Sequence, residues 1–105
     1  INLFYTMSTS KLPIYTFEEN YWAMQAKALS HPARIKIIQL ITQHRGITAA
    51  ELSKMIKLSR TSTHQHLQYL IGAKFVRESY EPHKYELYID KTIFSHFIGF
   101  IGMLE

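Results

Sequence analysis

The side chains best suited to recognising another molecule gather in one short stretch, residues 57–68. This stretch carries an amine, a guanidinium, hydroxyls, imidazoles and carboxamides, and it contains no carboxylate. An arginine can donate two hydrogen bonds to a guanine edge, and a glutamine can pair in the same way with adenine. Short hydroxyls at a helix N-terminus suit phosphate, because free backbone N–H groups attract anions there. These residues therefore indicate recognition of nucleic-acid bases and phosphates, and the alternative is a polar helix face that meets only solvent.

Helix caps around this stretch indicate how it is held. Thr16–Glu19 and Thr48–Glu51 have the capping-box spacing, in which a Thr hydroxyl and a Glu carboxylate each accept a backbone N–H. Ser59 is a favourable N-cap, and Gly46 suits a left-handed helix end. The spacing of apolar residues predicts helices over residues 16–29, 32–43, 48–56, 60–72 and 90–104. In the third of these helices we expect Leu52, Met55 and Ile56 to face inward.

The apolar pattern changes period after residue 74. Phe75–Tyr80 and Tyr85–Ile89 are β-rich runs, and the four residues between them predict a hairpin. Two short helices joined by a tight turn and followed by a hairpin form the winged helix-turn-helix layout. The sequence therefore predicts a mainly α fold with a small β-hairpin, in which the terminal helices form a dimer interface. The expected units are a disordered N-terminal extension at 1–15, a domain at 16–105 containing the helix-turn-helix at 48–72 and the wing at 75–89, and dimerisation helices at 16–29 and 90–104.

This layout assigns a role to each candidate residue. The major groove is ~12 Å wide and admits one α-helix, while the hairpin tip reaches an adjacent groove or phosphate. We expect base contacts from Arg60, Thr61, His64, Gln65 and Gln68. We expect phosphate contacts from Lys57 and Ser59, and wing contacts from Arg77, His83 and Lys84.

Residues 28–89 resemble the ArsR-type family of bacterial transcriptional repressors. ALSHPARIKIIQLI (28–41) is similar to the opening second helix of that family, which commonly reads Ala-Leu-x-x-Pro-x-Arg-Leu-x-Ile-Leu. AAELSKMIKLSRTSTHQHLQYLIGAKFV (49–76) is similar to its helix-turn-helix segment, with Leu58-Ser59 and His66-Leu67 in register. The resemblance implies a homodimeric repressor that binds double-stranded DNA at a palindromic operator.

The chain departs from the family pattern at the metal sites. The metal-sensing members carry Cys-x-Cys before the recognition helix, where this chain has Ile47–Ala49. A second family site uses Asp-x-His and two further ligands on the last helix, where this chain has Asp90–Thr92 and only His96 beyond. Neither site carries over, so we expect no metal and no other cofactor. The glycine that follows the recognition helix in the family aligns with Lys74, so either that helix ends early or Lys74 is left-handed.

Histidine and cysteine usage agrees with that expectation. There are six histidines and no cysteine. His64 and His66 are two residues apart on a helix, so they point about 200° apart and cannot bind one ion. We interpret His66 as a packing, hydrogen-bonding or phosphate-binding group. Because the sequence also lacks a Gly-rich phosphate loop and paired carboxylates on one predicted face, we predict that the chain is not an enzyme.

The charge distribution favours a polyanionic partner. The formal net charge is +4, and six basic but only three acidic residues lie between Gly46 and Lys84. No apolar run approaches the ~20 residues that span a bilayer, and no signal-peptide pattern opens the sequence. We therefore expect a cytoplasmic protein that does not enter a membrane. Met7 is a candidate natural start, which would make residues 1–6 an upstream segment. Leu104-Glu105 is interpreted as a non-native addition, and no function is assigned to either end.

The last predicted helix is apolar around nearly its whole circumference. Such a helix is normally buried on all sides, and one small domain offers too little cover, so we expect a homodimer. The predicted dimer interface is Phe17, Tyr21, Trp22, Met24, Phe94, Phe97, Ile98 and Ile101. In the alternative, the first helix and the N-terminal segment cover the last helix within one chain. The alternative function is that of a protein-interaction module, in which the winged-helix domain docks onto a larger complex through this apolar helix. The sequence does not identify an effector.

Overall fold

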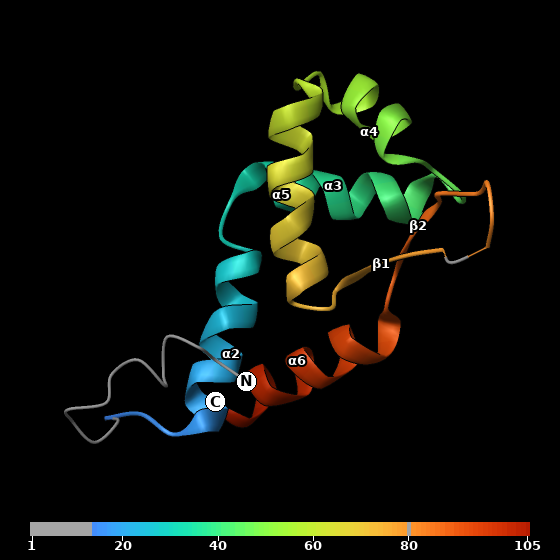
Figure 1. The fold of residues 1–105 in the computed structure, drawn as a ribbon. Coiled ribbons are helices and arrows are strands. Elements are labelled where there is room, and N and C mark those ends of the chain that lie inside the picture. Colours follow the sequence, from blue (N-terminus) through green and yellow to red (C-terminus); the bar gives the residue numbers. More distant parts are fainter. Residues whose placement is uncertain (1–13, 80) are drawn as a thin grey trace.

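Five helices and a two-stranded sheet make up residues 14–79 and 81–105, the part of the chain that this computed structural model describes (Figure 1). The helices are α2 (Phe17–Ala28), α3 (Pro32–Gln43), α4 (Ala49–Ile56), α5 (Arg60–Gly72) and α6 (Lys91–Met103). The strands are β1 (Val76–Glu78) and β2 (Leu87–Ile89). The predicted fold class, mainly α with a small hairpin, is confirmed. None of the described helices is long and apolar enough to cross a membrane.

Most of the predicted N-terminal extension lies outside the described residues. Of residues 1–15, only Ile14 and Tyr15 are described, and both are exposed. Tyr80, which the sequence places at the end of the first strand, is also outside the described part. The domain boundaries and the disorder of the extension therefore stay predictions.

Reciprocal caps start α2 and α4 at the predicted residues. The Thr16 hydroxyl accepts the Glu19 N–H at 3.0 Å, and the Glu19 carboxylate accepts the Thr16 N–H at 2.9 Å. Thr48 and Glu51 form the same pair at the start of α4. The Thr48 N–H, followed by its hydroxyl, lowers the pKa of the Glu51 carboxyl. Because such caps satisfy N–H groups that have no partner inside the helix, they fix helix starts locally.

The two strands pair antiparallel, and β2 is also bonded to the body of the domain. Val76 lies opposite Ile89, and Glu78 lies opposite Leu87. The Leu87 N–H also donates to the Ile47 carbonyl at 2.8 Å. This bond joins the hairpin to the segment that leads directly into α4.

Both strands are shorter than the predicted runs of 75–80 and 85–89, and the connection between them is longer than four residues. The cause lies in the backbone, because φ is 66° at His83 and 53° at Tyr85. Left-handed residues turn the chain out of an extended ladder. Pairing at the tip side therefore ends with the Ser79 N–H, which donates to the Glu86 carbonyl at 2.8 Å.

Phe75 is the centre of the hydrophobic core. It is fully buried, and its ring centroid lies 4.4 Å from that of Phe94 and 5.7 Å from that of Phe97, both on α6. The other buried apolar side chains of this core come from α2 to α6, the strands and the segments between them, and include Ile37, Leu40, Ile41, Ile47, Leu52, Leu67, Leu70, Val76 and Leu87. One core therefore holds the helices and the hairpin root together.

Helix α4 differs from the prediction at one core position. Leu52 is fully buried, but Met55 is 41% exposed, so the expectation that Met55 faces inward is wrong. Ser53 is buried beside Leu52 instead. Its hydroxyl donates to the Ala50 carbonyl at 3.0 Å, and this bond satisfies the polar group without water. A small, hydrogen-bonded side chain thus takes the inward position, and Met55 lies at the edge of the core.

Helix α5 ends in a Schellman turn whose left-handed residue is Lys74. The Phe75 N–H donates to the Leu70 carbonyl and the Lys74 N–H to the Ile71 carbonyl, both at 3.0 Å. The φ of Lys74 is 70°, so the left-handed alternative is the correct one. In this conformation the Cβ of a non-glycine residue crowds the following carbonyl oxygen, at a cost of roughly 1 kcal/mol.

Replacing Lys74 with glycine should therefore stabilise the protein. We expect Lys74→Gly to raise the free energy of unfolding by about 1 kcal/mol, measured by urea denaturation. Lys74→Ala is the matched control, because it removes the amine but keeps the Cβ, and it should change stability much less. Equal stabilities of the two variants would show that the left-handed backbone is not strained.

Candidate nucleic-acid interface

Helix α5 has one exposed polar face and one buried face. At ~100° per residue, the five side chains predicted to contact bases fall within an arc of about 140°. These five, Arg60, Thr61, His64, Gln65 and Gln68, are all exposed. Thr63, Leu67 and Leu70 point to the other side, and each is at most 2% exposed. The structure therefore gathers the predicted base-contacting residues on one open surface.

The N-terminus of α5 offers unsatisfied backbone donors. Ser59 caps the helix, its hydroxyl oxygen accepting the Ser62 N–H at 3.0 Å. Among residues 14–79 and 81–105, nothing accepts the N–H groups of Arg60 and Thr61. The left-handed Lys57, with φ of 61°, makes the turn before this helix end. The positive end of the helix dipole and the free N–H groups together favour an anion here.

A recess of about 350 Å³ adjoins this helix end. Its walls are Ala49, Arg60, Thr61, Thr63 and His64. Thr63 is 1% exposed, and its hydroxyl has no hydrogen-bond partner within the described chain. A guanidinium, an imidazole and hydroxyls beside free N–H groups suit a phosphate oxygen. Nothing in the sequence indicated this polar contribution from Thr63, because a lone hydroxyl in a helix carries no signal of its surroundings.

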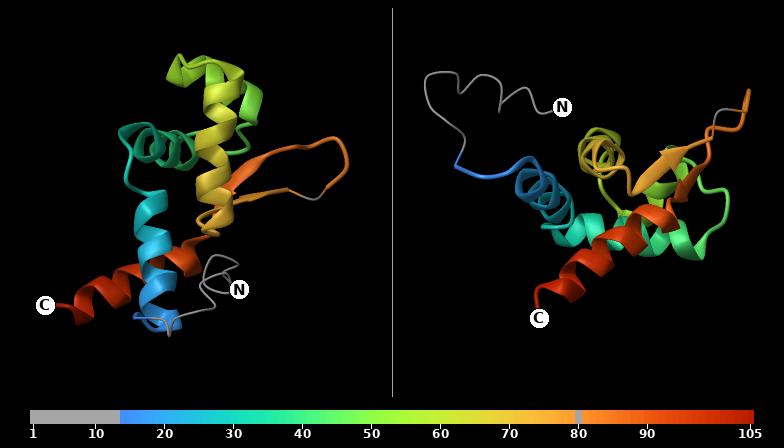
Figure 2. Two further views of the ribbon diagram at one scale, coloured as in Figure 1. Left: turned by 60° about the vertical axis from the view of Figure 1, so that its left-hand side comes forward. Right: turned by 90° about the horizontal axis from the view of Figure 1, so that it is seen from below.

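The hairpin tip projects away from the helices (Figure 2). His83 and Lys84 lie at this tip, and both are exposed. The Lys84 amine lies 3.1 Å from the Glu81 carboxylate, and both side chains remain largely open to solvent. Solvent-exposed pairs of this kind are weak, so Lys84 can exchange its partner for a phosphate at little cost.

Arg77 is placed differently from the other wing residues. Its Nε donates to the Asp90 carboxylate at 2.7 Å, and this ion pair ties β1 to the first residue before α6. The Arg77 bond, ahead of the Ile93 N–H, lowers the pKa of the Asp90 carboxyl. Arg77 therefore supports the root of the hairpin, whereas His83 and Lys84 extend from its tip.

Residues 31–76, from the start of α3 to β1, match the sequence family described as winged helix-turn-helix DNA-binding. One similar solved structure is the homodimeric winged helix-turn-helix DNA-binding domain of Mb0332 from Mycobacterium bovis, described as a possible ArsR-family transcriptional regulator. The match has a TM-score of 0.67 and 16% sequence identity, and it covers 89% of this chain and 90% of that chain. The fold is a winged helix-turn-helix.

A crystal structure of a possible transcriptional regulatory protein from the same organism matches with a TM-score of 0.66 and 18% identity, over 85% of this chain and 96% of that chain. At such identities the likeness concerns the fold alone. No curated protein sequence matches the chain. In this winged helix-turn-helix, α4 and α5 form the helix pair, α5 takes the position of the recognition helix and the hairpin takes that of the wing.

A buried cation braces the recognition helix from behind. Arg34, on α3, is only 9% exposed. Its Nε donates to Nδ1 of His66 at 3.2 Å, its Nη1 donates to the Lys27 carbonyl at 3.0 Å, and its guanidinium lies 3.7 Å from the centroid of the Tyr69 ring. The interpretation of His66 as a hydrogen-bonding group is confirmed. The role of Arg34 was missed, because its partners are far away in the sequence.

His66 has to be neutral to make this contact. Burial is the largest cause that lowers the pKa of His66, followed by the charges of His31 and Arg34. The His31 and His66 ring centroids lie 4.5 Å apart. Protonation would remove the lone pair that accepts the Arg34 N–H and would place a second cation beside it. No group of three His, Asp or Glu side chains in the described residues is placed to hold a metal ion.

Aromatic side chains join α2 to α6 within one chain. The Trp22 ring stacks on Phe100 with centroids 4.6 Å apart and planes 6° apart, and it lies 6.2 Å from Phe97. Phe97 is 9% exposed, and Phe94 packs against Phe75. The expectation that Phe97 faces a second copy is therefore corrected, because α2 and the core already cover it.

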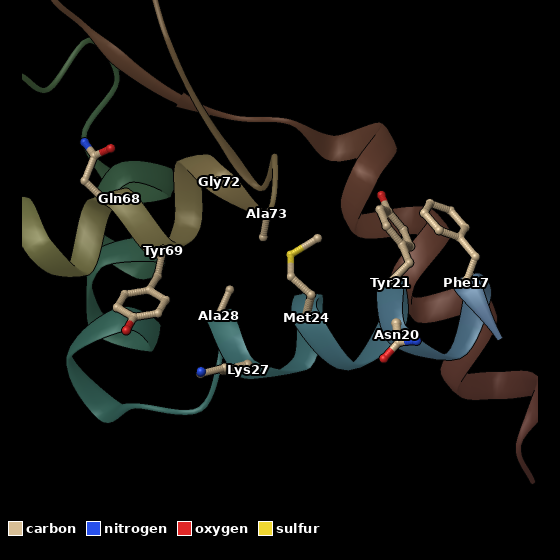
Figure 3. Close-up of a pocket in the computed structure, with 10 residues that line it drawn as sticks. All are labelled: Phe17, Asn20, Tyr21, Met24, Lys27, Ala28, Gln68, Tyr69, Gly72 and Ala73. Atoms are coloured by element: carbon tan, nitrogen blue, oxygen red, sulfur yellow. The ribbon is translucent and has the colours of Figure 1, made fainter. Parts of the chain in front are cut away.

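The other predicted interface residues lie on two different surfaces. Ile98 and Ile101 are exposed on the outer side of α6, with Ile98 65% exposed. Phe17, Tyr21 and Met24 line a cleft between α2 and α5 (Figure 3). The first helix thus covers only part of α6 among the described residues, and an apolar stripe on α6 stays open to solvent.

Because the pKa of His66 is lowered on folding, stability should depend on its protonation. The folded state prefers neutral His66, so its contribution is complete above the ordinary value of 6.5 and is lost as the pH falls through the lower folded pKa. Urea denaturation between about pH 7.5 and pH 5 should show this loss, which spans the range in which histidines titrate.

His66→Asn tests this prediction, because the amide oxygen can replace Nδ1 as an acceptor but does not titrate. Over that pH range we expect the free energy of unfolding to fall by about 1 kcal/mol less in the variant than in the wild type, which is the size of one hydrogen bond. Parallel pH profiles for the two proteins would contradict a role for His66 protonation.

Proposed function

We propose that this protein is a sequence-specific DNA-binding transcriptional regulator that inserts α5 into the major groove. The observation that carries the proposal is the exposed, acid-free face of α5, which begins at free N–H groups beside a polar recess. A groove ~12 Å wide admits one such helix. The match of residues 31–76 to a DNA-binding family supports the same function.

Each exposed group then has a proposed partner. The arginine, histidine and glutamine side chains along α5 would contact base edges, with Arg60 suited to guanine and Gln65 or Gln68 to adenine. Lys57, Ser59 and the recess would hold a phosphate at the helix N-terminus. His83 and Lys84 would contact the flanking backbone, and Arg77 would act by holding the root of the wing.

We further propose that the regulator is a homodimer. Ile98 and Ile101 form the open apolar stripe on α6, and a Cβ built at Gly99 or Gly102 would meet nothing within 4 Å. These glycines leave room for close approach of a second helix. The Mycobacterium bovis domain with the same fold is described as homodimeric. Two recognition helices related by two-fold symmetry and ~34 Å apart would match a palindromic operator.

The resemblance of residues 28–89 to ArsR-type proteins supports a bacterial repressor acting in the cytoplasm. The description of the Mycobacterium bovis protein as a possible ArsR-family regulator points the same way. Repression would follow from occupation of an operator that overlaps a promoter. The positions that bind metal in the family's sensors are Ile47–Ala49 here, so we propose that the regulatory signal is not a metal at that site.

The DNA-binding proposal is tested by selecting a binding site from random duplexes and measuring affinity by fluorescence anisotropy. Gln65→Ala should relax base preference and cost about 1–3 kcal/mol at one position of the site. Lys84→Ala should weaken binding to all sequences alike and reduce the salt slope by about one. Lys36→Ala, an exposed charge deletion on α3, is the matched control and should leave both properties unchanged.

The charge-reversed double variant Arg60→Glu, Lys84→Glu separates this function from the alternative of a docking module. It should abolish DNA binding without changing the oligomeric state. A wild-type protein that ignores duplex DNA even at low salt would contradict the proposal and favour the docking module.

The dimer is tested by light scattering on the purified chain. We expect a mass of about twice the 12.3 kDa of one chain, falling to that of one chain in the double variant Ile98→Glu, Ile101→Glu. Ile35→Glu, which places the same charge on a similarly exposed isoleucine of α3, should leave the dimer intact. A monomeric wild type, or a dimer that survives the α6 charges, would exclude this interface.

A further inference from the structure

A cleft of about 640 Å³ lies between α2 and the C-terminal half of α5 (Figure 3). Phe17, Tyr21 and Met24 form one wall, and Tyr69 and Gly72 belong to the other. The Met24 side chain extends from α2 toward α5, and the Tyr69 ring extends from α5 toward α2 (Figure 3). Small-molecule sites in proteins typically measure about 300–1,000 Å³ and are mainly apolar, as this cleft is.

Gly72 borders this cleft without any conformational need for glycine. It is the last residue of α5, it has no positive φ, and a Cβ built on it would meet no atom within 4 Å. Glycine in a helix is less favourable than alanine by about 1 kcal/mol. Neither a left-handed turn nor close packing against the described residues explains this residue. A side chain larger than that of alanine at this position would therefore extend into the cleft.

The polar groups of the cleft select an anion. Lys27 is the one charged side chain in the lining, no acidic side chain lines the cleft, and Lys27 has no ion pair among residues 14–79 and 81–105. The Tyr21 hydroxyl oxygen accepts the Gln25 amide at 3.2 Å, which leaves its own proton free to donate. Gln25 also donates to the Ala73 carbonyl at 3.1 Å, so one buried side chain fixes both walls.

We propose that this cleft binds a small organic anion with an aromatic or alkyl body, whose acidic group pairs with Lys27. The apolar body lies between Met24, Tyr69 and the open side of Gly72, and the aromatic rings of Phe17 and Tyr21 bound the far end. The charge of Lys27 and the absence of a lining carboxylate distinguish this occupant from a neutral lipid or a cationic amphiphile.

The regulatory consequence rests on the proposed DNA-binding function. Gln68 lines the cleft and also belongs to the exposed face of α5 that we propose reads bases. An occupant of the cleft therefore touches the recognition helix, and its binding is coupled to DNA binding in both directions. The cleft ligand is thus an effector of the regulator.

Binding is tested on the full chain with 4-phenylbutyrate as the probe and 4-phenylbutanol as its uncharged counterpart. The chain has four glycines, so selective labelling with ¹⁵N-glycine gives four amide signals, and Gly72→Ala identifies the one in the cleft. We expect phenylbutyrate to shift the Gly72 signal and to leave Gly99 and Gly102, on α6, unchanged. Shifts confined to α6, or none at all, would overturn the proposal.

Affinity measurements on variants give the second test. Gly72→Leu fills the cleft and should weaken the binding of phenylbutyrate about tenfold or more. The matched variant Gly72→Ala should bind phenylbutyrate nearly as tightly as the wild type does. Lys27→Gln should weaken phenylbutyrate about threefold to fivefold and leave phenylbutanol unchanged. Normal phenylbutyrate binding by Gly72→Leu would show that the cleft is not a ligand site. A changed oligomeric state in Gly72→Leu would also exclude a ligand site and would show that a second copy of the chain occupies the cleft.

The effector role has its own readout. Saturating phenylbutyrate should change the affinity for the selected operator at least about fivefold in the wild type, the lower end of typical coupling, and not in Gly72→Leu. An unchanged operator affinity with a shifted Gly72 signal would overturn the effector role. A protein that fails to bind DNA can still show the phenylbutyrate-dependent shift of the Gly72 signal. Failure of the proposed DNA-binding function is therefore distinguishable from failure of the ligand site.

Discussion

The turn after α5 holds the rest of the structure in place, because three other elements depend on its backbone. The Phe75 N–H closes α5 on the Leu70 carbonyl. Gln25 of α2 donates to the Ala73 carbonyl, and the Asp90 N–H before α6 donates to the Phe75 carbonyl at 2.9 Å. The Phe75 side chain then fills the core against α6. The direction of the recognition helix is therefore set at its C-terminal end, while its N-terminal end stays free to meet a partner.

A second attachment fixes α5 along its length. Arg34 links α3 to His66 and Tyr69, and its other donor reaches the carbonyl of Lys27 at the end of α2. With both attachments made, the exposed side chains of α5 project from a helix that is already ordered. Binding then costs less conformational entropy than it would from a loop, since the backbone has been fixed by folding.

Local signals in the sequence predicted most of the fold, and contacts between distant residues could not be predicted. The capping boxes at Thr16 and Thr48 involve residues three positions apart, so spacing alone identified them. Arg34 and His66 are 32 positions apart, and nothing local indicates that pair. Apolar periodicity identified Phe97 as buried but did not distinguish cover by the same chain from cover by a second copy. The cleft beside Gly72 has no signal in the sequence, because it arises only from the relative placement of α2 and α5.

The wing is bonded to the body of the domain along its strands, and its tip projects away from the helices (Figure 2). The bond from Leu87 to Ile47 and the ion pair between Arg77 and Asp90 hold both strands close to the body. Beyond Ser79 and Glu86 no strand pairing within the described residues continues. Lengthening such a closed loop costs little, about 0.6 kcal/mol for each doubling. Evolution or design can therefore lengthen or recompose this tip to alter the footprint on a partner, while the core and the orientation of α5 are inherited unchanged.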